Sequence, residues 1–146
     1  LEHSLELQPT ARTDALTRSA TESKAFGRSL HADFYGVRRE LCDDLGFCYA
    51  LLDQLVEHLG MHKQSPPYIF RSPEDQFPDK AGLSGWVPLI ESGISLHTLT
   101  VKEFMTFDIY TCGELDASKC LEFLCARLAP SKYEHHYLVR GLAYHA

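Results

Sequence analysis

Three short runs of strand-like sequence follow one another between Leu83 and Thr111, with only a few residues between them. The runs cover residues 83–90, 94–99 and 105–111. Parallel neighbours in a sheet need a crossover connection of a dozen or more residues, whereas antiparallel neighbours need only a short turn. The spacing therefore predicts an antiparallel sheet at the centre of the fold.

A further strand is predicted at 29–35, because Leu30, Ala32 and Phe34 alternate there with polar residues. Such alternation is typical of a strand with one buried face. Two more extended segments are predicted at 68–70 and 133–139, the second as an edge strand.

Two amphipathic helices are predicted beside the sheet. Apolar residues recur at intervals of three and four from about Arg38 to Leu59, and Gly60 ends that stripe. A second stripe begins after Asp116, a typical N-cap residue, and ends at Leu128. Two helices on one face of an antiparallel sheet give an α+β fold, a two-layer sandwich. The other face then needs a cover, and we expect self-association as a homodimer.

The whole chain has 146 residues, enough for one ordinary domain. We predict a flexible N-terminal tail at 1–28, which is rich in small and charged residues, and a single domain at 29–146. A net charge of −6 gives no general attraction to nucleic acid or to an anionic membrane. Five cysteines without paired spacing favour a reducing, cytoplasmic location.

The segment 82–113, GLSGWVPLIESGISLHTLTVKEFMTFDIYTCG, carries the motifs that bear on chemistry. It resembles the short bacterial and archaeal S-adenosylmethionine decarboxylases, which carry Gly-x-Ser-Gly, Glu-Ser-His, His-Thr-Trp-Pro-Glu and Asp-x-Phe-Thr-Cys-Gly. The positions that match without a gap are Ser84, Glu91-Ser92, His97-Thr98, Asp108 and Thr111-Cys112-Gly113.

This resemblance implies a self-cleaving proenzyme of polyamine and spermidine biosynthesis. The chain would be cut between Glu91 and Ser92, and Ser92 would become a pyruvoyl group that forms a Schiff base with an amine substrate and acts as an electron sink during decarboxylation. The resemblance assigns His97 as the base that removes the α-proton of Ser92, and Cys112 as the later proton donor. Both types of side chain titrate in a suitable range. Ser84 is implied to support processing.

Strand geometry limits how these residues can meet. Ser92 and His97 in one straight strand would lie ~17 Å apart and point to opposite faces. We therefore expect the backbone to turn near Gly93. A hairpin whose loop centres on 102–104 would place His97 opposite 107–110 and close to Cys112.

Two departures from the family motifs leave the substrate open. Gly93 replaces the histidine that follows the processed serine, and Leu99-Thr100-Val101 replaces Trp-Pro-Glu. The lost glutamate is implied to hold the ribose of S-adenosylmethionine, and Val101 accepts no hydrogen bond. L-Arginine or L-ornithine is therefore an alternative substrate, and an unprocessed homologue that acts as a binding or regulatory partner is another alternative. The candidate substrate contacts are Phe70, Tyr68 and Asp108.

The remaining histidines and cysteines have simpler interpretations. Cys42, Cys48, Cys120 and Cys125 lie on the apolar helix faces and are predicted to be core residues. A metal site built from His58, His62, His135 and His136 is a minor alternative. Gly60 interrupts the helical spacing of the first two histidines, so we predict no metal.

Overall fold

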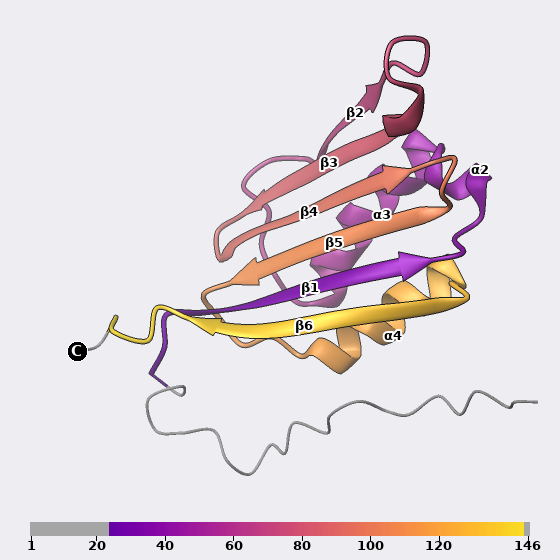
Figure 1. Cartoon of the computed structure of the whole chain (residues 1–146). Coiled ribbons are helices and arrows are strands. Elements are labelled where there is room, and N and C mark those ends of the chain that lie inside the picture. Colours follow the sequence, from indigo (N-terminus) through magenta and orange to yellow (C-terminus); the bar gives the residue numbers. More distant parts are fainter. Residues whose placement is uncertain (1–23, 145–146) are drawn as a thin grey trace, which may run out of the picture.

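The computed structural model describes residues 24–144, and its centre is a six-stranded antiparallel sheet (Figure 1). The strands are β1 (Gly27–Tyr35), β2 (Tyr68–Ser72), β3 (Gly82–Leu89), β4 (Ser92–Leu99), β5 (Phe104–Thr111) and β6 (Lys132–Arg140). Their order across the sheet is β2-β3-β4-β5-β1-β6. The three central runs thus form the predicted antiparallel meander, and β1 lies between β5 and the edge strand β6.

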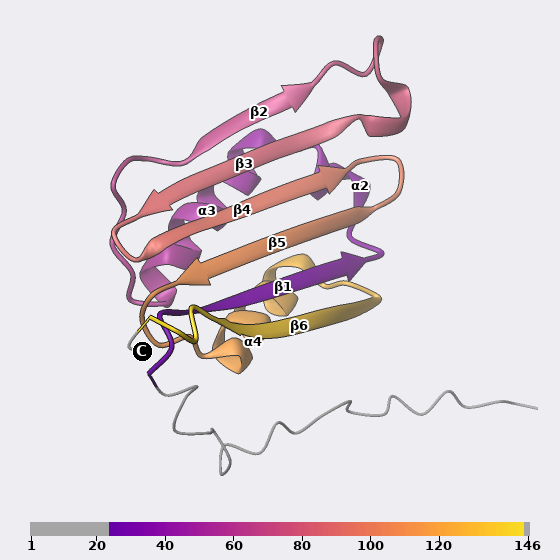
Figure 2. The ribbon, with the colours of Figure 1, turned by 60° about the vertical axis from the view of Figure 1, so that its left-hand side comes forward.

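The helices cover one face of this sheet (Figure 2). They are α2 (Arg39–Cys42), α3 (Leu45–His58) and α4 (Ala117–Leu128), and a short 3-10 helix, η1 (Pro78–Lys80), precedes β3. The predicted fold class, an α+β two-layer sandwich with helices on one face, is confirmed.

Alternation along the strands decides which side chains enter the core. In β1, Leu30, Ala32 and Phe34 are fully buried, whereas His31 between them is partly exposed. The same helix-covered face receives Leu96 from β4 and Phe107 from β5. The main helical contribution to this core comes from Cys48, Leu51, Leu52, Leu55 and Val56 of α3 and from Cys120, Leu121, Leu124 and Leu128 of α4.

The prediction of one helix from about Arg38 to Leu59 is wrong in one respect, because two helices, α2 and α3, occupy this range. α2 ends at Cys42, and α3 begins at Leu45 after Asp44. The Asp44 carboxylate accepts a hydrogen bond of 2.9 Å from the backbone N–H of Phe47, which is the geometry of an N-cap. Capping side chains compete with a continuous helix, so Asp44 starts a new helix instead. Asp116 caps α4 as expected.

The sheet begins earlier in the chain than predicted. Gly27 pairs with Arg140, so residues 27–28 belong to β1 and not to a tail. The rest of the predicted tail, 1–23, lies outside the described residues. No helix within 24–144 is long and apolar enough to span a membrane.

The sheet face that points away from the helices is termed the open face. Within residues 24–144 no helix or strand lies over it (Figures 1 and 2). Its side chains alternate with the core residues along each strand, and they include His31 of β1, His97 of β4 and Asp108 of β5. The open face therefore carries polar side chains from several strands.

Candidate active site

The Glu91-Ser92 pair lies at a tight turn between β3 and β4. Leu89 pairs with Ser92, so only Ile90 and Glu91 connect the two strands. Ser92 has a φ of 150°, a conformation that residues with a side chain rarely adopt. Local backbone strain of this kind tends to occur where it serves chemistry. The bond predicted to break therefore directly precedes the strained residue of this turn, Ser92.

Cys112 reaches this turn through its backbone. Ser92 pairs with Thr111 at the end of β5, and the backbone N–H of Cys112 donates a hydrogen bond of 2.8 Å to the carbonyl oxygen of Glu91. A donor in this position polarises the carbonyl that precedes Ser92 and would stabilise negative charge on its oxygen. The Cys112 side chain is exposed.

The Glu91 side chain is fixed as well. His62 donates from its backbone N–H to one carboxylate oxygen at 3.0 Å, and its Nδ1 lies 2.5 Å from the other. Burial raises the pKa of Glu91, but these hydrogen bonds outweigh it, so that the pKa lies below the usual range for a glutamate. Glu91, Ser92, Cys112 and His62 are termed the cleavage cluster.

His97 lies elsewhere, on the open face. It pairs with Thr106, so the expected register, which placed it opposite 107–110 and near Cys112, was wrong. The loop occupies 100–103, and Leu99 pairs with Phe104, which moves His97 away from the end of β5. Instead, Nδ1 of His97 lies 3.1 Å from Oγ of Ser84 on β3. Ser84 and His97 are termed the outer-face pair.

The expected turn at Gly93 was also wrong. The chain turns two to three residues earlier, at residues 90–91, and Gly93 continues β4 opposite Pro88 and Tyr110. Five residues of extended strand therefore separate Ser92 from His97, a distance of ~17 Å. The structure brings Glu91, Ser92 and Cys112 together, and Ser84 with His97, but it does not bring the two groups together within one chain.

The candidate substrate contacts are all on or near the open face. Asp108 lies 2.6 Å from Nδ1 of His31, whose Nε2 lies 3.0 Å from Oγ of Ser29. Phe70, an exposed residue of β2, pairs with Ser84, and Tyr68 stacks against Trp86. Phe70 thus lies beside the outer-face pair rather than beside the cleavage cluster.

Comparison with known proteins places this arrangement in a family. The family model described as S-adenosylmethionine decarboxylase matches residues 28–141. The chain belongs to the S-adenosylmethionine decarboxylase family. The resemblance and the expected class of enzyme, a decarboxylase made as a proenzyme, are therefore confirmed at the level of the family.

Relatives from archaea and bacteria cover most of the chain. An S-adenosylmethionine decarboxylase proenzyme of Thermoplasma acidophilum is 36% identical over 116 residues, which cover 79% of this chain and 83% of that protein. An arginine decarboxylase proenzyme of Aeropyrum pernix is 34% identical over 123 residues, which cover 82% of this chain and 88% of that protein. The crystal structure of adenosylmethionine decarboxylase from Aquifex aeolicus matches with a TM-score of 0.67 and 29% identity, covering 81% of this chain and 92% of that chain.

The departure at Gly93 from the family motif has a steric reason. A Cβ at this position would lie 2.9 Å from Nε1 of Trp86, closer than such atoms approach each other. A side chain at position 93 would therefore require the Trp86 indole, which is half exposed, to shift. Val101, the other departure, lies in the loop after β4 with an exposed side chain.

Of the other four cysteines, Cys42, Cys48 and Cys120 are buried in the core as predicted, and Cys125 is partly buried against it. Burial raises the pKa of Cys42 to about 11 and that of Cys48 to about 12. Burial likewise raises the pKa of Cys120 to about 12, and it also raises the pKa of Cys125. These thiols stay protonated and unreactive near neutral pH.

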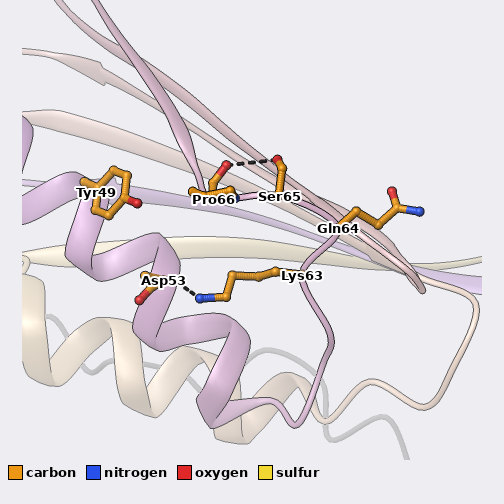
Figure 3. A pocket seen from close by; sticks show the side chains of 6 residues that line it. All are labelled: Tyr49, Asp53, Lys63, Gln64, Ser65 and Pro66. Carbon is orange, nitrogen blue, oxygen red and sulfur yellow. Dashed lines mark hydrogen bonds and ion pairs between the residues drawn. The ribbon is translucent and has the colours of Figure 1, made fainter.

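A cavity of about 400 Å³ opens between α3 and the segment that follows it (Figure 3). It is lined by Tyr49, Asp53, Lys63, Gln64, Ser65 and Pro66, and Lys63 forms an ion pair with Asp53. No predicted site residue lines it. The minor alternative of a histidine metal site is not supported either, since residues 24–144 contain no group of three side chains arranged to hold a metal ion.

Sequence reasoning missed two groups of the cleavage cluster. His62 was considered only as a metal ligand, and Cys112 only for its thiol. The backbone N–H of Cys112 leaves no trace in the sequence, because any residue except proline supplies one. His62 is 29 positions from Glu91, and no local pattern links them.

Proposed function

We propose that this chain is a self-cleaving, pyruvoyl-dependent decarboxylase of polyamine biosynthesis that breaks its own Glu91-Ser92 bond. The observation that carries the proposal is the hydrogen bond of 2.8 Å from the N–H of Cys112 to the carbonyl oxygen of Glu91, directly before a strained Ser92. Family membership supplies the reaction class, and this contact supplies its local chemistry.

The first step is an acyl shift from nitrogen to oxygen. Oγ of Ser92 attacks the carbonyl carbon of Glu91, the peptide C–N bond breaks, and an ester with a free amine at residue 92 forms. Negative charge develops on the Glu91 oxygen during the attack, where the N–H of Cys112 already donates. Release of the strain at Ser92 favours this step.

The second step is an elimination. A base removes the α-proton of Ser92, and the Cβ–O bond breaks. The main-chain carboxylate of Glu91, not its side chain, leaves with the electron pair and becomes the new C-terminus of the first fragment. Water hydrolyses the resulting dehydroalanine with release of ammonia, which leaves a carbonyl at residue 92. A histidine suits the base because its pKa lies near neutrality, and we assign this role to His97, supported by Ser84.

The cleavage cluster fits a pyruvoyl group at position 92. Such a group accepts an amine substrate and the electrons released when carbon dioxide leaves. Cys112 follows Thr111, the partner of Ser92 on β5, and its thiol is exposed, which supports a role in returning a proton to the substrate carbon. We assign it as the proton donor of the decarboxylation.

We further propose that the enzyme is a homodimer that associates through the open face. His97 is ~17 Å along the strand from Ser92 in its own chain and cannot serve it there. A second chain on the open face brings another outer-face pair, and with it Phe70, toward the cleavage cluster. Symmetric association of this type is the most common form of small oligomers.

For the substrate, we propose S-adenosylmethionine, with L-arginine or L-ornithine as the second candidate. Two observations favour the second candidate: Val101 stands where the family glutamate is implied to bind ribose, and the Aeropyrum pernix relative is named arginine decarboxylase. A site that has lost a hydrogen-bonding carboxylate discriminates poorly for hydroxyl groups. Phe70, Tyr68 and Asp108 remain the proposed substrate contacts. Five free cysteines support a cytoplasmic enzyme.

Denatured mass measurement of the purified chain tests the proposal. We expect two fragments, residues 1–91 and 92–146, the second without a free amino terminus. Release of labelled carbon dioxide from S-adenosylmethionine, arginine and ornithine then identifies the substrate. A folded chain that keeps its full mass of 16.5 kDa on prolonged incubation would overturn self-cleavage and support the unprocessed partner instead.

A further inference from the structure

The turn that carries the scissile bond is held from outside by the segment that follows α3. The backbone N–H of Ile90 donates to the carbonyl of His62 at 2.9 Å, and the N–H of Gln64 donates to the carbonyl of Pro88 at 2.9 Å. Lys63 forms an antiparallel bridge with Leu89 between these two contacts. Residues 62–64 thus run antiparallel to the end of β3 and reach the turn itself.

Within residues 62–64, His62 also contacts the turn through its side chain. It meets both oxygens of the Glu91 carboxylate, through its backbone N–H and through Nδ1. The Glu91 side chain has only 22% of its surface exposed, whereas the His62 ring is 76% exposed. The ring therefore gains little from burial, and its position is explained by the carboxylate it contacts.

The two ends of Glu91 are held by different elements. The carboxylate is tied to His62, and the carbonyl oxygen is tied to the N–H of Cys112. Fixing the side chain limits rotation of the peptide unit that Ser92 must attack. Reaction rates depend steeply on such alignment of the reacting atoms.

We propose that His62 is a positioning residue for self-cleavage: through the Glu91 carboxylate it keeps the scissile carbonyl aligned with the Cys112 N–H. This inference rests on the proposed function and adds a residue to it. Among residues 24–144, the hydrogen-bond partner of the His62 ring is Glu91, so the ring acts through Glu91.

The test is the rate of cleavage of freshly refolded chains, measured as the appearance of fragment 92–146. We expect His62→Ala to slow cleavage about three- to ten-fold, a modest factor because the ring is exposed and the backbone donor remains. His62→Asn keeps a donor near the position of Nδ1 and should restore most of the rate. His58→Ala changes another exposed histidine, four residues earlier, and should leave the rate unchanged.

A double-mutant cycle separates positioning from a general structural effect. If His62 acts through Glu91, His62→Ala should add no further slowing to Glu91→Ala. Thermal unfolding of the same variants in a Ser92→Ala background, where cleavage is blocked, checks that each chain folds.

The outcomes separate the role of His62 from the proposed function. Equal cleavage rates for the parent chain and His62→Ala would overturn the inference and leave the proposed function standing. Multiplicative slowing in the double variant would overturn it as well, because His62 would then act independently of Glu91. A parent chain that never cleaves would overturn the proposed function and this inference together.

Discussion

The cleavage cluster and the outer-face pair share one hairpin, but the chain completes them to different degrees. In the cleavage cluster, the segment after α3 and the end of β5 both hold Glu91 at the turn, so the bond proposed to break is held by contacts within its own chain. In the outer-face pair, the side chains of Ser84 and His97 hydrogen-bond to each other, and both lie on the open face. One region is already arranged around its reacting bond, whereas the other still lacks the group on which it would act.

This difference separates two requirements of the reaction. Attack on the Glu91 carbonyl needs a hydroxyl and a donor, and both are local. Removal of the α-proton needs a base, and the proposed base is ~17 Å away along an extended strand. The proposed first step therefore needs a single chain, and the proposed second step depends on assembly.

The largest effect is expected at Ser92, which both steps require. Ser92→Ala should abolish cleavage completely, because alanine offers neither the attacking oxygen nor the leaving bond. Ser95→Ala, on the same strand and opposite Trp86 and Asp108, is the matched control and should still yield both fragments. Denatured mass spectrometry distinguishes these results. Fragments from the Ser92→Ala chain would refute the assigned cleavage site.

The outer-face pair can be tested by mixing chains. His97→Ala should slow cleavage about 10²- to 10⁴-fold, the usual contribution of a general base. If the base comes from a second copy, refolding His97→Ala together with Ser92→Ala should restore cleavage of the His97→Ala chain, whose own Ser92 then meets an intact His97. Quantitative gel analysis with differently sized tags follows each chain. No gain on mixing would mean that His97 acts within its own chain or not at all.

The extent of prediction from sequence differs between the same two regions. Strand positions and the N-cap Asp116 follow from local alternation and capping, which depend on neighbouring residues only. The register of the β4–β5 hairpin does not follow from local patterns, because it depends on the conformation of the connecting loop. Residues 100–103 form a four-residue connection with Glu103 at a φ of 51°, and this moves His97 to a position opposite Thr106. A small error in the loop therefore misplaced the base.

The contacts of the cleavage cluster could not be derived from periodicity at all. His62 and Glu91 meet because β3 returns past the end of α3, a consequence of the sheet order and not of either segment alone. The replacement at Gly93 was visible in the sequence, but its reason was not. It becomes clear only when Trp86 is seen to lie against that position.

Cys112 offers a pair of substitutions that separate its backbone from its thiol. Cys112→Pro removes the N–H that donates to Glu91 and should slow cleavage about 10²-fold or more, as loss of an oxyanion donor does elsewhere. Cys112→Ala keeps the N–H, so cleavage should continue while decarboxylation falls sharply. Fragment formation and carbon dioxide release measure the two effects separately. Equal cleavage by both variants would show that the N–H of Cys112 does not contribute to cleavage. Thermal unfolding of each variant controls for misfolding.

The smallest expected effect concerns stability and the charge on Glu91. Its pKa is lowered in the folded chain, so its ionised form stabilises the fold above the ordinary glutamate pKa of about 4.3, and this contribution is lost as the pH falls through the lowered value. In a Ser92→Ala background, Glu91→Gln should therefore lower the free energy of unfolding at about pH 7 by at most about 1 kcal/mol and should have a smaller effect at about pH 3. Urea unfolding at the two pH values measures this difference. A pH-independent difference would mean that the contact between His62 and Glu91 does not depend on the carboxylate charge, and that the cleavage cluster is held by its backbone contacts alone.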